Sequence, residues 1–226
     1  MISLLYLCLT KNIIVMPNWC YNNIQITGEP KGIKKISLII DTLRNEKDDV
    51  RLFQSLIGLP KGTDMDKYET GDWYNTNVEW FGTKWDVGLD FVQEVTNDYI
   101  YLSGETAWSP PIRFCVELAK LYNLEIEMYY EEPGSDFCGK CWIDSEGNYS
   151  EEDYDYQEGL YRFDGYNEWY DREWTNQIEW LVEQYEDEIN PNLTDIIKEH
   201  FHFLTDEEVE ECAEDLRKEM DLAKSE

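Results

Sequence analysis

Two hydrophobic periods alternate along the first two thirds of the chain, and their order limits what the chain can fold into. Residues 19–27, 99–105 and 124–130 alternate apolar and polar side chains, which is the period of a β-strand with one buried face. Residues 30–44 and 110–122 place apolar side chains three and four positions apart, which is the period of an amphipathic helix. The order strand, helix, strand, helix, strand, with room for one more strand after the first helix, predicts an α+β fold with the split βαβ sheet of ferredoxin-like proteins.

The two helices are expected to cover one face of this sheet and to leave the other face open. A further strand from Phe137 to Trp142, with Gly134 and Gly147 as turn residues, is expected to pair back on the strand before it. The alternation gives the open face mainly tyrosine and acidic side chains, namely Tyr21, Asn23, Tyr99, Tyr101, Glu125, Glu127 and Tyr129.

The charge divides the chain into two parts. The 226 residues include 49 acidic and 19 basic side chains, which gives a net charge of −30. Residues 151–226 hold 26 of the acidic and six of the basic residues, so this last third carries −20 of the net charge. We therefore expect a ferredoxin-like domain over residues 16–150 and an acidic helical segment over residues 151–226. Residues 1–15 are expected to be either an extension from a start upstream of the true one or an extra strand.

Three amphipathic helices are predicted in the last third of the chain. Residues 174–185 carry one apolar stripe, a short helix follows Asn192, and a capping box from Thr205 to Glu208 begins the last helix. The buried side chains are expected to be Trp174, Ile178, Leu181 and Tyr185 in the first helix and Val209, Cys212, Leu216 and Met220 in the last. The stripes are expected to dock on the open face of the sheet or to join two copies of the chain in a homo-oligomer.

Either arrangement turns a row of glutamates toward solvent. Such a dense anionic surface could imitate the backbone of DNA and bind a protein that otherwise holds nucleic acid. The candidate residues of this partner surface are Glu173, Glu179, Glu183, Glu207, Glu210, Glu211 and Glu214.

Two tryptophan motifs are the least ordinary part of the sequence. Residues 80–86 read Trp-Phe-Gly-Thr-Lys-Trp-Asp, and residues 106–111 read Thr-Ala-Trp-Ser-Pro-Pro. Tryptophan has a large apolar area and one N–H that needs a partner, so these side chains either pack together or hold something else. We expect Trp85 and Trp108 to contact each other. The candidate binding residues are Trp80, Lys84, Trp85, Asp86, Trp108, Ser109 and Arg113.

Lys84 has two interpretations. It could bind an anion such as a nucleotide, or it could form an ion pair with Asp86 or a neighbouring acid, and the acidity of the chain favours the ion pair. Ser109 is predicted to be the N-cap of the helix over residues 110–122, where the two prolines fit the first turn. Arg113 adds a second cation to the same region.

Four motifs in this order resemble the YubB-type ferredoxin-like family of phages, plasmids and other mobile elements. They are Asn18-Trp-Cys-Tyr-Asn-Asn with the strand to Gly28, Gly82-Thr-Lys-Trp-Asp, Thr106-Ala-Trp-Ser-Pro-Pro, and Tyr130-Glu-Glu-Pro-Gly-Ser-Asp-Phe-Cys-Gly. The resemblance spans roughly residues 16–142. It implies the ferredoxin-like fold and a mobile-element setting, but it implies no activity. The insertion of Phe81 between Trp80 and Gly82 departs from the family's pattern.

Other chemistry is weakly represented. Cys138 and Cys141 have the spacing of metal ligands, but their apolar neighbours favour a plain strand, so we predict no metal site and no cofactor. Two histidines, His200 and His202, are too far from the tryptophan motifs in the sequence to predict a nucleophile system there. The irregular spacing of the six cysteines favours reduced thiols and a cytoplasmic location in the host cell.

The acidity excludes direct binding to nucleic acid and to anionic membranes at long range. The leading hypothesis is therefore a non-enzymatic accessory protein of a mobile element that binds a host protein, with mimicry of DNA by the acidic helices as one version. The alternative is a protein that binds or sequesters a small nucleotide-type ligand in the tryptophan region. An enzyme acting on nucleotides is the residual hypothesis.

Overall fold

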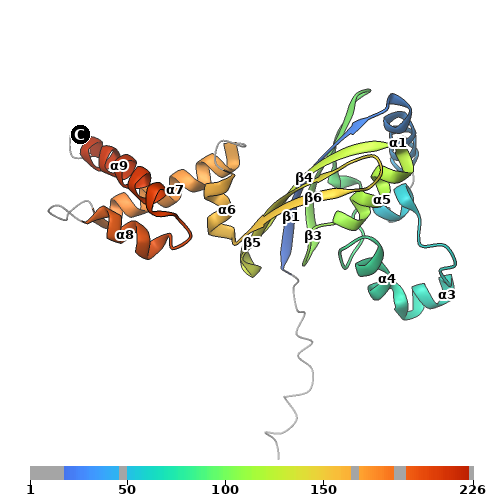
Figure 1. The fold of residues 1–226 in the computed structure, drawn as a ribbon. Helices are drawn as coiled ribbons and strands as arrows, with labels where there is room; N and C mark the ends of the chain where they lie inside the picture. Colours follow the sequence, from blue (N-terminus) through green and yellow to red (C-terminus); the bar gives the residue numbers. More distant parts are fainter. Residues whose placement is uncertain (1–17, 46–49, 164–167, 186–191, 224–226) are drawn as a thin grey trace, which may run out of the picture. The chain divides into compact units, whose positions relative to one another are not determined.

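The computed structural model describes residues 18–45, 50–163, 168–185 and 192–223 (Figure 1). The chain forms two compact units: residues 1–135 with 142–149, and residues 136–141 with 150–226. Each unit is described by itself below. The expectation for residues 1–15 lies outside the described residues.

One six-stranded sheet has the strand order β2-β3-β1-β4-β5-β6. Its strands are β1 (Trp19–Gly28), β2 (Val92–Val95), β3 (Tyr99–Ala107), β4 (Leu124–Glu132), β5 (Phe137–Ile143) and β6 (Tyr149–Tyr154). β1 runs antiparallel to both β3 and β4, and β2 runs antiparallel to β3. β1 therefore fills the gap between the parallel strands β3 and β4, while β3 fills the gap between β1 and β2. These are the two split βαβ units of a ferredoxin-like domain, so the fold class predicted from the sequence is confirmed.

The helices of the first unit lie between its strands in the sequence. α1 (Pro30–Leu43) follows β1, and α5 (Ile112–Tyr122) joins β3 to β4. The connection from α1 to β2 holds α2 (Leu52–Ile57), α3 (Met65–Lys67), a π-helical turn (Tyr68–Asp72), α4 (Trp73–Trp80) and a 3-10 turn (Leu89–Phe91). A second 3-10 turn, Pro133–Ser135, follows β4.

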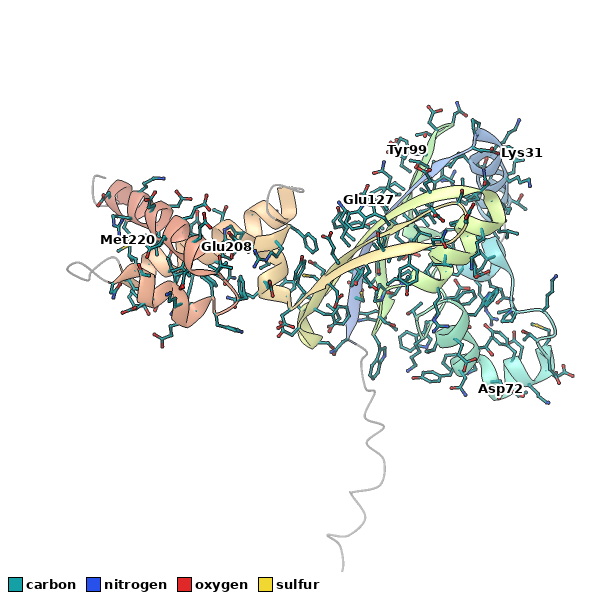
Figure 2. All side chains as sticks on the ribbon, viewed as in Figure 1. Lys31, Asp72, Tyr99, Glu127, Glu208 and Met220 are labelled. Atoms are coloured by element: carbon teal, nitrogen blue, oxygen red, sulfur yellow. The ribbon has the colours of Figure 1, made fainter. Side chains whose placement is uncertain are left out.

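α1 and α5 cover the same face of the sheet, as expected. The two helices contact each other, and Figure 1 shows both on one side of the sheet. Along β1 every second residue from Cys20 to Ile26 is buried on that side, whereas the residues between them are exposed. Figure 2 shows Lys31 at α1 and shows Tyr99 and Glu127 on the opposite side of the sheet.

One helix boundary differs from the sequence-based expectation. α5 begins at Ile112, and Pro111 rather than Ser109 occupies its N-cap position, so the prediction of a Ser109 cap is wrong. The physical reason is that the Ser109 hydroxyl donates to the Gly82 carbonyl and is committed to another loop.

The second unit is helical and has its own core. It contains α6 (Tyr156–Arg162), α7 (Glu168–Tyr185), α8 (Leu193–His200) and α9 (Asp206–Ala223). Trp174 lies 5.0 Å from the ring of Tyr161 and 5.1 Å from that of Phe201, measured between ring centroids. Leu181 from α7 is fully buried, as are Val209 and Leu216 from α9.

The stripes of these helices are therefore buried against one another, because α9 packs on both α7 and α8. The sequence predicted which side chains are apolar and buried. It predicted that these side chains pack against the sheet or against a second copy of the chain, and it did not predict that the helices pack against one another. Docking of the acidic helical segment on the open sheet face stays a prediction.

No helix within the described parts of the chain has both the length and the apolarity to cross a bilayer.

The capping box at the start of α9 is confirmed. The Glu208 carboxylate accepts from the Thr205 backbone N–H at 2.8 Å, and the Glu208 N–H donates to the Thr205 hydroxyl at 3.3 Å. The same carboxylate pairs with the Arg162 guanidinium of α6. That pairing, helped by the Thr205 hydrogen bonds, lowers the pKa of Glu208 to about 2.

We expect Glu208→Gln to remove part of the acid sensitivity of the second unit. A glutamate whose pKa is lower in the folded state stabilises the fold above its unfolded value of 4.5, and this contribution is lost as the pH falls toward 2. The pair is partly exposed, so its contribution is limited by screening to about 1–2 kcal/mol. The measurement is the free energy of unfolding of the second unit between pH 7 and pH 2, which should fall less in the variant. Glutamine keeps the capping box, whereas Thr205→Ala should cost about 1 kcal/mol at both ends of this range. Equal pH profiles for wild type and Glu208→Gln would contradict the assignment.

Candidate functional site

The two tryptophan motifs are joined by direct hydrogen bonds. The Ser109 hydroxyl donates to the Gly82 carbonyl at 2.6 Å, and the buried Thr83 hydroxyl donates to the Ala107 carbonyl at 3.0 Å. Gly82 has φ +87°, and a Cβ there would lie 3.2 Å from the Pro110 carbonyl oxygen, so the close approach of the loops requires glycine. The sequence therefore folds residues 82–86 against residues 106–111 as one rigid structure.

A buried polar network supports this structure from the sheet side. The Asn22 amide donates to the Thr106 hydroxyl at 2.9 Å, and that hydroxyl donates to the Ser109 carbonyl at 2.8 Å. Trp108 stands between these anchored residues with φ +78°, and its backbone N–H donates to the Asn18 carbonyl at 2.9 Å. A non-glycine residue in this left-handed region is strained by roughly 1–3 kcal/mol, and the surrounding bonds hold it there.

Lys84 lies among three aromatic rings. Its ammonium nitrogen is 4.6 Å from the ring centroid of Trp85 and 5.8 Å from those of Trp108 and Tyr74. The buried amide of Asn77 donates to the Lys84 carbonyl at 3.1 Å and fixes the backbone beneath it. These distances are typical of cation–π contacts. Trp85 and Trp108 are therefore brought together through the ammonium between them.

The ring partner of Trp85 is Trp19 at the start of β1, with ring centroids 5.8 Å apart. Trp19 is paired with Ala107 across β1 and β3, and Tyr21 lies two residues along the same face. Figure 1 shows α4, which carries Tyr74, at the end of the sheet where β1 begins. We call the group around Lys84 the aromatic patch; its members are Trp19, Tyr21, Tyr74, Trp85 and Trp108.

The aromatic patch is exposed to an unusual extent. Trp108 exposes 50% of its surface, Tyr74 47%, Tyr21 46% and Trp19 38%. Trp85 is half-buried beneath them. Large exposed aromatic groups that gather at one place on a surface are typical of interaction sites, whereas single exposed ones are common.

Asp86 has a structural part in this arrangement. Its carboxylate accepts from the backbone N–H groups of Phe53 at 2.7 Å, Gln54 at 2.9 Å and Val87 at 2.7 Å. It thereby caps the N-terminus of α2, and burial raises its pKa although the backbone N–H groups oppose this effect. The ion pair proposed between Lys84 and Asp86 is not formed among the described residues, because the carboxylate is occupied by these backbone groups.

The remaining candidates connect the patch to its surroundings. The Trp80 indole N–H donates to the Gly58 carbonyl at 2.9 Å, which joins the end of α4 to the end of α2. Arg113 is exposed, and its guanidinium donates to the Glu79 carbonyl at 3.0 Å. Ser109, as above, joins the two loops. Of the candidate binding residues, Trp80, Ser109 and Arg113 therefore support the patch, Trp85 and Trp108 belong to it, and Lys84 lies among its rings.

Two open pockets flank Trp85. One has a volume of about 450 Å³ and is lined by Trp19, Trp85, Asp90, Gln93 and Glu105 among others. The second has a volume of about 480 Å³, and its walls include Arg51, Tyr68, Glu69 and Trp73. Arg51 in the second pocket is already paired with Glu69 at 3.1 Å. Both pockets are open to solvent, and neither is an enclosed tryptophan-walled cavity.

The acidic helices present most of the expected partner surface. Six of its seven glutamates are exposed: Glu179, Glu183, Glu207, Glu210, Glu211 and Glu214. Glu173 is half-buried and lies 3.6 Å from the Arg172 guanidinium. On α9 the four exposed glutamates lie three and four residues apart, so they share the face opposite the buried stripe.

The cysteines of the described residues are thiols outside any disulfide, and all of them are buried. Burial raises the pKa of Cys20, and it raises that of Cys141 to about 12 and that of Cys212 to about 11. Such thiols are poor nucleophiles at neutral pH. Within the described parts of the chain no three His, Cys, Asp or Glu side chains are grouped as metal ligands. Cys138 instead lies 3.8 Å from the Tyr156 carbonyl oxygen.

Sequence reasoning missed several members of the site. Trp19 was assigned only to the strand β1, and Tyr74 lies in the helix α4, which was not predicted. Asp90 and Glu105 are two among many acids, and nothing in their spacing indicates that they line one pocket. The exposed face of β1 was the available signal, because it places Trp19 and Tyr21 at the same end of the sheet as Trp108.

Comparison with known proteins supports the ferredoxin-like domain. The family model described as a ferredoxin-like domain in Api92-like protein matches residues 101–171. The chain is also similar to the crystal structure of a protein api92 from Yersinia pseudotuberculosis, with 12% identity over 62% of this chain and 98% of that chain and a TM-score of 0.38. No curated protein matches the chain. The YubB-type resemblance and its mobile-element setting stay predictions.

Proposed function

We propose that the protein is a non-enzymatic accessory protein of a mobile element, and that it binds a basic host protein in the cytoplasm through the aromatic patch. The observation that carries this proposal is Trp108, which combines a strained backbone with a half-exposed ring. Glycine would fit this position without strain, and the exposed ring adds little to the core. A strained residue held by its neighbours at a surface is typical of a functional position.

The charge of the chain favours a basic partner. A net charge of −30 attracts cationic surfaces and repels nucleic acid and phosphate groups. Aromatic rings bind lysine and arginine side chains through cation–π contacts, and acids around them add ion pairs. The surface of a nucleic-acid-binding protein carries such side chains. A small nucleotide-type ligand is less favoured, because both pockets are open and both have carboxylates in their lining.

The test is capture of partners from a host lysate with the full chain and two variants. Trp108→Gly removes the patch ring, whereas Trp180→Ala removes a tryptophan of similar exposure, 46%, from α7. The proposal expects a basic protein that is captured by wild type and Trp180→Ala, is lost with Trp108→Gly, and is released by added DNA. Capture that is the same for all three proteins would overturn it.

A second candidate is mimicry of DNA by the acidic helices. The observation in its favour is that α7 and α9 bury their apolar stripes and expose six of the seven expected glutamates. In this version the partner is also a nucleic-acid-binding protein, but it contacts the second unit.

Reversal of Glu207, Glu210, Glu211 and Glu214 to lysine separates the two candidates. These side chains are exposed, so we expect each reversal to change the stability of the second unit by about 0.5 kcal/mol or less. Mimicry predicts at least about a tenfold loss of affinity at 50 mM salt and a flatter salt dependence. Four exposed acids of the first unit, Glu94, Asp98, Glu125 and Asp66, reversed together, provide a control with the same change in charge. Equal losses for both quadruple variants would show that only the net charge matters.

A further inference from the structure

The pocket between Trp19 and β3 has a composition that selects one kind of side chain. Its aromatic walls are Trp19 and Trp85, and its exposed carboxylates are Asp90 and Glu105. Among the described residues no lysine or arginine lines it, although the Lys84 ammonium lies 4.6 Å from the ring centroid of Trp85. A flat cation is the ligand that these walls fit, because a ring attracts positive charge over its face and a carboxylate accepts from N–H groups at the edge.

The two carboxylates are placed by the fold. Asp90 lies in the 3-10 turn before β2, and its Oδ1 atom is so close to Gly88 that a Cβ there would lie 2.6 Å from it. Glu105 is on the exposed face of β3, beside Tyr21 across the β1–β3 pair. The charge of Glu105 raises the pKa of the Tyr21 hydroxyl.

The side of the pocket toward β2 is also rich in acceptors and is held in place. The Gln93 side-chain N–H group donates to the Asp90 carbonyl at 2.8 Å and to the Ser103 carbonyl at 3.1 Å. These bonds fix the backbone of the 3-10 turn that carries Asp90 against β3. The pocket is preformed, which lowers the cost of ordering on binding.

We propose that this pocket binds an arginine side chain of the protein partner, with the guanidinium against Trp19 and Trp85 and its N–H groups toward Glu105 and Asp90. This inference rests on the proposed function, since it names the group by which the basic partner is recognised. Guanidinium is planar, stacks on aromatic rings and donates in a fixed fork, whereas the lysine ammonium is compact and strongly hydrated. The pocket therefore selects arginine over lysine.

The experiment uses the full chain and three peptides: acetyl-Gly-Arg-Gly-amide, the same peptide with lysine, and the same peptide with citrulline. Citrulline has nearly the shape of arginine without its charge. Binding is followed by the NMR shifts of the tryptophan indole N–H groups in a titration. We expect the arginine peptide to bind with a Kd on the order of 1 mM, the lysine peptide about threefold more weakly, and the citrulline peptide at least about tenfold more weakly.

Two variants and a matched control locate the binding. Glu105→Gln should weaken the arginine peptide by about three- to tenfold, and Trp19→Ala should weaken it further. Glu125→Gln removes the same charge from β4 outside the pocket, and it should leave the Kd within about twofold of wild type. Glu105→Gln replaces an exposed side chain, so the test does not depend on the folding of Trp19→Ala.

The experiment distinguishes failure of the arginine pocket from failure of the proposed function on which it rests. No binding of the arginine peptide, equal binding of the citrulline peptide, or equal loss in Glu105→Gln and Glu125→Gln would overturn the arginine pocket. Capture of a partner that depends on Trp108 would in that case still support the proposed function. Selective arginine binding without any captured partner would instead leave the pocket in place and refute the function.

Discussion

Replacement of Asp86 by alanine is expected to lower the free energy of unfolding of the first unit by about 2–4 kcal/mol. The carboxylate accepts from three backbone N–H groups, those of Phe53, Gln54 and Val87. Phe53 is fully buried, and its ring lies 4.0 Å from that of Phe114 in a stacked arrangement. Loss of the cap therefore leaves donors unpaired next to the core and loosens α2, which packs on α5.

The measurement is a urea titration followed by NMR signals from β1 and β3, so that the first unit is observed by itself. Asp72→Ala is the matched control, because Asp72 stands at the N-cap position of α4 but makes no side-chain cap bond and is exposed (Figure 2). The control should change stability by about 0.5 kcal/mol or less. Equal effects of the two substitutions would show that the Asp86 hydrogen bonds do not contribute to the free energy of unfolding beyond the effect of an ordinary surface substitution.

The capping of α2 by Asp86 could not be predicted from the sequence. Asp86 was expected to bind a ligand or Lys84, because those possibilities lie within its own motif. Its actual partners are backbone groups 32 and 33 residues earlier. A cap supplied from a distant loop leaves no local pattern, since any acid can accept from a helix N-terminus and this chain has 49 of them.

The sheet could be predicted because burial on one face imposes a period on the sequence. β1 and β3 bury alternate residues on the side of α1 and α5, and that period is visible without neighbours. β4 alternates only as far as Met128, because Met128, Tyr129 and Tyr130 are buried in succession, so the prediction that Tyr129 is exposed on the open face is wrong. α4 was missed for the opposite reason: within it only Asn77 is buried, while Tyr74 and Val78 on one face are exposed. A helix without a buried stripe has no helical period to recognise.

The acidic helices illustrate a different limit. Their stripes were predicted residue by residue, and Val209, Leu216 and Leu181 are indeed fully buried. An apolar stripe predicts which side of a helix is buried, but it does not predict which element covers that side. The aromatic groups that complete this core, Tyr161 and Phe201 among them, have no common spacing with the stripes.

The candidate site was predicted in part from the residue types of its two tryptophan motifs. Lys84, Trp85 and Trp108 lie together because the two loops that carry them are joined by Ser109 and Thr83. The sequence could not show whether these tryptophans belong to the core. Had Trp108 been a core residue, its truncation would cost about 3–5 kcal/mol. With half of its surface exposed, a much smaller cost is expected.

Trp108→Gly is expected to leave the stability of the first unit unchanged or to raise it by up to about 1 kcal/mol, because glycine adopts the φ of +78° without strain. Trp108→Ala keeps the strain and loses the ring, so it should be less stable than Trp108→Gly by about 1 kcal/mol. Urea titrations of the two variants measure this difference directly.

Binding should respond in the opposite way. An exposed tryptophan at the centre of an interface contributes about 2 kcal/mol or more, so both variants should bind the purified partner at least about 30-fold more weakly than wild type. Trp180→Ala, with a ring of similar exposure on α7, should retain full affinity. A structural Trp108 would give the reverse result, with reduced stability and an unchanged Kd. Since glycine would serve the fold at least as well at this position, a loss of binding without a loss of stability would explain why the chain keeps a strained tryptophan there.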